Sequence, residues 1–101
     1  KTKEFIDKYQ AKYGYVPDDV AALTWDSINI VLNAIQQAGK IDPDLKKERK
    51  IIRDNMANMA KFDGITGSMK FDANRDPIKC AVIVRVTDKG SFAFVESVCP
   101  K

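Results

Sequence analysis

The chain changes its hydrophobic period once, within the tract from Phe62 to Pro77, and this change most constrains its fold. Before the tract, apolar residues recur at helical spacing, and after it they alternate as in β-strands. The tract itself holds two glycines, a short apolar pair and an acidic turn. The sequence therefore predicts an α/β chain in which a helical half is joined by a connector to a strand-like half.

Helices are predicted before any strand, and the first of them is amphipathic. Aromatic residues recur at every fourth position within residues 2–13, and Gly14 ends this helix. A second helix begins at about Pro17 or Asp18 and continues to Ala38. Apolar and small residues occupy most of its circumference, which predicts contacts on more than one side. Because the sequence shows no parallel strand for this helix to cover, the chain is predicted to be incomplete.

A third helix, a short strand and a β-hairpin are predicted to follow. Asp42 is expected to be the N-cap of the helix and Pro43 its first residue, and the helix should end by Asp63. Beyond Lys79 apolar residues alternate as in a strand. The three residues Asp88–Gly90 fit a type I turn followed by a left-handed glycine, which creates a bulge.

Composition excludes several classes of function. The 101 residues carry a net charge of +3, with 17 basic and 14 acidic residues intermixed, so nucleic-acid binding is not expected. The sequence has no histidine, which removes Ser-His-Asp and Cys-His catalysis and histidine zinc sites. No pair of carboxylates stands out as an acid/base couple. We therefore expect no enzyme activity, no metal site and no cofactor.

Three other functional interpretations of local motifs are weak. Residues 72–76 have the spacing that opens a calcium loop, but Pro77 replaces the required glycine and Ile83 the bidentate glutamate. Residues 64–68 have the glycines of a phosphate-binding loop without its Gly-Lys-Ser/Thr ending. The aromatic residues of the first helix and Trp25 could stack on ligands, but helical spacing favours packing in the core. We interpret the tract as an acidic turn within a connector.

The two cysteines, Cys80 and Cys99, stand at the outer ends of the predicted hairpin strands. With a two-residue turn they face each other. With a three-residue turn Cys80 faces Val98, and Cys99 points to the opposite side unless a bulge restores the phase. A disulfide therefore remains one of two alternatives, and the other leaves both residues as small apolar side chains. A disulfide would favour an oxidising, extracytoplasmic setting.

Several motifs, taken in order, resemble the C-terminal part of type I periplasmic binding proteins, the branched-chain amino-acid class of transport receptors. Residues 62–77 resemble that family's Phe-x-Gly-x-Thr-Gly-x-x-x-Phe-Asp-x-x-Gly-Asp signature, with Arg75 in place of the usual second-last glycine. Residues 5–17 match its Phe-x-x-x-Tyr-x-x-x-Tyr-Gly-x-x-Pro helix and turn. Residues 34–39 match its Ala-Ile-x-x-Ala-Gly helix end, and residues 77–95 its closing hairpin.

The resemblance implies a position for this chain within a two-lobed fold. Family members have two α/β lobes, joined by three crossovers, that close on a small ligand by a hinge motion. Residues 1–71, helices and short strand, would belong to one lobe, residues 72–77 would form a hinge-like connector, and residues 78–99 would form the hairpin of the other lobe. The candidate hinge residues are Asp72, Asn74 and Asp76.

The resemblance also implies a function. Val20, Ala21 and Leu23, at the start of the second helix, would form an apolar wall of the ligand cleft, and the alternative is that they are buried within the lobe. The implied role is non-catalytic binding of branched-chain amino acids or a similar small molecule for an ABC-type transporter, with its membrane permease as partner. A signal peptide is expected upstream and a periplasmic location follows.

Two other functions remain open: a sensory or regulatory receptor domain for amides or amino acids, and a free-standing interaction domain. For the isolated chain, apolar helix faces that lack their sheet predict self-association.

Overall fold

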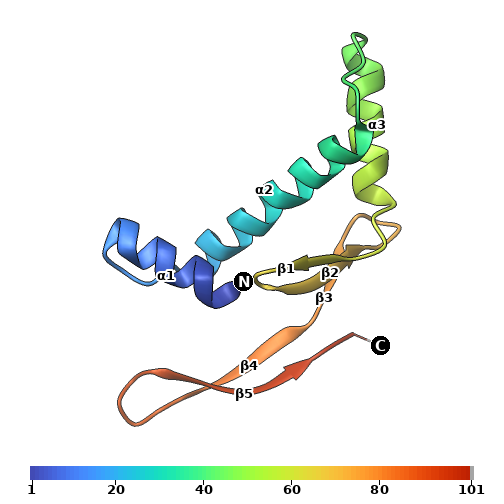
Figure 1. Ribbon diagram of the computed structural model, residues 1–101. Helices are drawn as coiled ribbons and strands as arrows, with labels where there is room; N and C mark the ends of the chain where they lie inside the picture. The colour runs from blue at the N-terminus through green and yellow to red at the C-terminus, as the bar shows by residue number, and fades with distance from the viewer. Residues whose placement is uncertain (101) are drawn as a thin grey trace.

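The computed structural model describes residues 1–100, which form three helices followed by five β-strands (Figure 1). The helices are α1 (Thr2–Tyr13), α2 (Asp19–Ala38) and α3 (Leu45–Ala57). The strands are β1 (Phe62–Gly64), β2 (Gly67–Phe71), β3 (Pro77–Lys79), β4 (Ala81–Val86) and β5 (Phe92–Val98). The predicted order of helices, short strand and hairpin is confirmed. The structure also contains two short strands that were not predicted, β1 and β3. Within the described residues no helix is long and apolar enough to cross a bilayer.

The ends of α1 and α2 follow from local capping. Gly14 has a φ of 81° and donates its backbone N–H to the carbonyl of Gln10, which ends α1. At the start of α2 the carboxylate of Asp18 accepts the backbone N–H of Ala21 at 2.8 Å. Gly39 follows the last turn with a φ of 74°. Because glycine adopts positive φ without a steric penalty, both helices end where the sequence predicts.

The predicted start of α3 is wrong by two residues. The N-cap is Asp44, whose carboxylate accepts the backbone N–H groups of Lys46 and Lys47 at 2.9 and 3.4 Å. Asp42 instead accepts the N–H of Asp44 at 2.9 Å and pairs with the ammonium of Lys47 at 2.6 Å. Pro43 therefore precedes the helix. The segment has two aspartates that could cap the helix, two residues apart. Asp44 is the cap, because the carboxylate of Asp42 accepts the N–H of Asp44 in an Asx turn that precedes the helix.

The tract expected to be a connector is a three-stranded antiparallel sheet in the order β1-β2-β3. Phe62 pairs with Met69 across the first turn, and Phe71 pairs with Pro77 across the second. The third helix therefore ends at Ala57, well before the predicted limit, and β3 includes two residues expected in the hairpin. Strands of three to five residues are too short to show a clear alternation of apolar and polar side chains.

Strands β4 and β5 form a separate two-stranded sheet. Gly90 has a φ of 72° and donates its N–H to Thr87 at 2.9 Å, while the N–H of Thr87 bonds to the carbonyl of Ser91 at 2.8 Å. The predicted three-residue turn is therefore present. Further along, Ile83 pairs with Glu96 but Val84 pairs with Phe94, so the register shifts by one residue.

The chain is open rather than compact. Figure 1 shows α1 and α3 at opposite ends of α2, with the hairpin projecting from the first sheet. The radius of gyration is 16.9 Å, whereas a compact domain of this length has about 13 Å. The accessible surface is 8225 Å², roughly 2,500 Å² more than a compact monomer of 11.3 kDa exposes. An excess of this size is comparable to an obligate protein interface.

The apolar core of the described residues is small for the same reason. Ile30 and Ala34 are the buried apolar residues, and both lie on one face of α2. Most other large apolar residues of this helix are exposed, as the predicted contacts on more than one side require. These exposed residues are Val20, Leu23, Trp25, Ile28, Val31, Leu32 and Ile35.

Candidate functional site

A buried carboxylate joins α2 to the turn between β1 and β2. Asp26 is 4% exposed and accepts the backbone N–H groups of Ile65 and Thr66, each at 2.9 Å. The hydroxyl of Thr66 donates to the same carboxylate at 2.6 Å and accepts a hydrogen bond from the ammonium of Lys79. A Cβ built on Gly64 would lie 2.3 Å from the carboxylate oxygen. Glycine is therefore required here for close approach, and the first sheet is anchored on the helix.

The sequence offered a signal for this contact that our interpretation did not use. Asp26, Ile30 and Ala34 lie four residues apart on one helical face, and that face is the buried one. An acidic residue in line with core positions indicates a buried hydrogen-bonding role, since a carboxylate without partners is costly to bury. Its partners lie about forty positions away, so helical periodicity alone does not name them.

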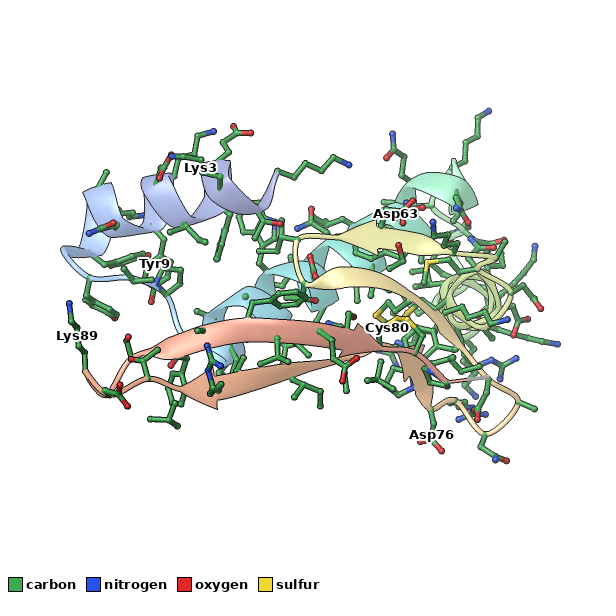
Figure 2. The ribbon with its side chains drawn as sticks, turned by 90° about the horizontal axis from the view of Figure 1, so that it is seen from below. Lys3, Tyr9, Asp63, Asp76, Cys80 and Lys89 are labelled. Atoms are coloured by element: carbon green, nitrogen blue, oxygen red, sulfur yellow. A yellow bond between two sulfur atoms is a disulfide. The ribbon has the colours of Figure 1, made fainter. Side chains whose placement is uncertain are left out.

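The three candidate hinge residues form a tight turn between β2 and β3. One carboxylate oxygen of Asp72 accepts the backbone N–H groups of Asn74 and Asp76 at 2.8 and 2.9 Å. The N–H of Asp72 in turn donates to the carbonyl of Asp76 at 2.9 Å. Arg75 adopts a φ of 73°, the conformation that the family's glycine would take without strain. Asp76 lies at the rim of the molecule in Figure 2.

The chain passes from one sheet to the other at a single residue, Cys80. Strand β3 ends at Lys79 and β4 begins at Ala81. In the structure Cys80 is bonded to Cys99, directly after β5 (Figure 2). The turn has three residues, and the register shift makes Val95 an extra residue that restores the phase between the cysteines. Of the two alternatives, the structure therefore has the disulfide.

The three candidate ligand residues do not share one face of α2. Ala21 lines a groove of about 960 Å³ between α1, α2 and the β1–β2 turn. Val20 and Leu23 lie outside this groove and are 64% and 44% exposed. With 100° between successive helical residues, Ala21 points roughly 160° away from Leu23. The structure therefore brings Val20 and Leu23 together and separates Ala21 from them.

Aromatic residues of α1 and α2 line the groove, and Tyr15, in the loop between the two helices, packs against them. The rings of Phe5 and Trp25 are 5.4 Å apart, and the ring of Tyr9 lies 4.5 Å from Tyr13 and 5.6 Å from Tyr15. The hydrogen bond between the hydroxyls of Tyr9 and Tyr15 raises the pKa of Tyr9 to about 12. The expected core position of Trp25 is wrong, because 50% of this residue is exposed. The cluster packs on itself and leaves one side open.

Comparison with known proteins places this arrangement in a family. The sequence model of the periplasmic binding proteins matches residues 1–91. The chain therefore belongs to the periplasmic binding protein family. Among solved structures it is similar to a leucine-binding protein, LivK, from Thermotoga maritima, with 32% sequence identity and a TM-score of 0.72.

That likeness covers 98% of this chain and 26% of the Thermotoga protein. The chain thus has the fold of one part of a type I periplasmic binding protein and spans about a quarter of the matched structure. The open shape and the uncovered faces of α2 agree with this, since they are surfaces of an incomplete α/β unit.

Proposed function

We propose that this chain is part of the ligand-binding component of an ABC-type amino-acid transporter. The component would be non-catalytic, would bind a branched-chain amino acid or a similar small molecule between two lobes, and would deliver it to a membrane permease. The observation that carries the proposal is the continuous family match over residues 1–91, together with 32% identity to a leucine-binding protein.

We further propose a periplasmic location. The disulfide between Cys80 and Cys99 supports it, because disulfides persist in oxidising compartments outside the cytoplasm. The family match points to the same compartment.

We propose the division that the resemblance implies, with residues 1–71 in one lobe, residues 72–77 as the connector and residues 78–99 in the other lobe. Ile78 and Lys79 are the exception, because they pair with β2 and therefore stay with the first lobe. The anchoring of the first sheet on α2 through Asp26 supports the first assignment. The separate sheet of β4 and β5 supports the last. The resemblance implies a hinge at Asp72, Asn74 and Asp76, in the turn that joins the paired strands β2 and β3. Hydrogen exchange in this turn should be faster than in the helix cores and should change when ligand binds. A turn that is as well protected as the helix cores, both with and without ligand, would exclude the hinge.

Calorimetric titration of the receptor that contains this chain tests the ligand class. L-leucine, L-isoleucine and L-valine should release heat of binding, whereas L-arginine and L-glutamate should not. Binding of the charged amino acids alone would refute the branched-chain assignment.

A matched pair of variants tests the apolar wall. Val20→Asp should weaken L-leucine binding by about tenfold or more, since an aspartate beside an aliphatic side chain must lose its hydration. Val86→Asp is the control, because Val86 has the same side chain and is also 64% exposed but lies at the turn end of β4. Unchanged affinity of the Val20 variant, with both variants folded by circular dichroism, would exclude Val20 from the cleft.

A further inference from the structure

The hairpin β4–β5 is connected to the rest of the described chain in an unusual way. Its strands pair with each other, whereas the other close packing is between α2 and α3 and within the first sheet. The chain enters the hairpin through one residue, Cys80, that lies between the two sheets. Rotation about the backbone of residues 79–81 would therefore change how the hairpin is oriented relative to the first sheet.

The disulfide lies at this same point. It joins Cys80 to Cys99, 19 residues later, at the open end of the hairpin rather than near its turn. Without it, β4 would be tied directly to the junction, whereas β5 of the described chain would be joined to it only through the turn and through pairing with β4. A two-stranded hairpin is marginally stable in water, so β5 could separate from β4 when the junction moves. With the disulfide, the first residue of β4 and the last residue of β5 are both held at the junction.

We propose that the Cys80–Cys99 disulfide positions the hairpin as one rigid arm that pivots at residues 79–81 when the two lobes close. The inference rests on the proposed two-lobed function. It moves the pivot from the acidic turn, which joins two paired strands of one sheet, to the junction three residues beyond it. In this proposal the disulfide holds the junction between the two sheets in place. That effect differs from a general stabilisation of the hairpin. A disulfide that only stabilised strand pairing would act equally well further along the same two strands.

The hairpin offers a matched position for that comparison. Val82 and Ser97 are register partners, two residues from Cys80 and Cys99 and before the register shift. Because side chains two residues apart point to the same face of a strand, a disulfide at this pair would have the same cross-strand setting. It would link β4 to β5 without including the junction residue.

Hydrogen exchange of the receptor containing this chain, read by mass spectrometry, tests the proposal. Three forms are compared: the native chain, Cys80→Ala/Cys99→Ala, and that double variant with Val82→Cys/Ser97→Cys added. Removing the native disulfide should accelerate exchange at residues 78–81 by about tenfold through local opening. The relocated disulfide should restore slow exchange in β4 and β5 but leave residues 78–81 fast.

Two results would overturn the proposal: unchanged exchange at residues 78–81 without the native disulfide, or full restoration there by the relocated one. If the double variant does not fold, the native chain is reduced with dithiothreitol. The dithiol supplies two electrons and two protons, the S–S bond becomes two thiols, and the dithiol closes into its own disulfide. The same two outcomes apply to the reduced chain.

A second arm uses L-leucine as the probe. In the native receptor L-leucine should slow exchange at residues 78–81, and removal of the disulfide should weaken its binding by about fivefold, because the closed arrangement is less well positioned. A native receptor that does not bind L-leucine contradicts the proposed function. The exchange comparison without ligand then still decides on the disulfide.

Discussion

Replacing Gly64 by alanine should disrupt the contact between α2 and the first sheet. A Cβ at this position would lie 2.3 Å from one carboxylate oxygen of Asp26, 2.5 Å from its carbon and 2.6 Å from the other oxygen. The carboxylate must then move by about 1 Å to reach ordinary van der Waals separation from the new carbon. Its hydrogen bonds to Ile65 and Thr66, now 2.6 to 2.9 Å long, cannot all survive that displacement.

The expected loss follows from those bonds. A hydrogen bond to a charged group contributes about 1.5–3 kcal/mol, so losing one or two of three should lower the free energy of unfolding by about 3 kcal/mol. Asp26→Ala removes all three bonds and should cost at least as much. Because the clash needs the carboxylate, adding Gly64→Ala to Asp26→Ala should cost little more, leaving a coupling energy of about 2–3 kcal/mol.

Urea unfolding followed by fluorescence measures these values, since the single tryptophan, Trp25, is adjacent to Asp26. Gly14→Ala is the control: no atom lies within 4 Å of its Cβ, and its φ of 81° alone should cost about 1 kcal/mol. That cost should add fully to the cost of Asp26→Ala. If the Gly64 and Asp26 effects also add, the clash with the carboxylate is not the cause and our reasoning is wrong.

Three further predictions follow from caps, ionisation and exposed surface. Asp44→Ala should lower the free energy of unfolding by about 1 kcal/mol and reduce helicity measured by circular dichroism, and a larger effect of Asp42→Ala would contradict the assigned cap. Between pH 10 and about 12 the folded chain keeps a phenol proton on Tyr9 that the unfolded chain releases, so stability should fall as pH rises through this window. Tyr15→Phe should lower the pKa of Tyr9 in an absorbance titration, and an unchanged pKa would exclude the hydroxyl contact as its cause. The isolated chain should self-associate with rising concentration in sedimentation velocity and bind an apolar dye, and a monomer without dye binding would refute this.

The helical half was predictable because its signals are local. Gly14 and Asp18 act within one turn of their own position, so they determine where α1 ends and α2 begins. The same logic failed at α3, where Asp42 and Asp44 are both capable caps and the choice depends on how the preceding loop folds. Local chemistry thus predicts that a helix begins, but two competing caps leave its first residue open.

The first sheet and the candidate site needed information that is not local. Strands β1 and β3 have three residues each, and their pairing partners rather than their own sequence define them. The buried role of Asp26 depends on Thr66, forty positions along the chain. The overall assignment came from the resemblance to a family. That resemblance rests on several motifs that occur in the family's order along most of the chain, whereas hydrophobic periodicity describes one helix or strand at a time. Val20, Ala21 and Leu23 remain predictions, since most of the matched fold lies outside this chain.

The register shift in the hairpin has a consequence for comparing relatives. Val95 is the extra residue that brings Cys99 opposite Cys80, so the bridge depends on the number of residues after the turn as much as on the cysteines. A relative with both cysteines but one residue fewer between Gly90 and the second cysteine would direct that thiol to the opposite face. In an alignment, a one-residue gap in this strand would therefore mark the loss of the bridge even where both cysteines are retained.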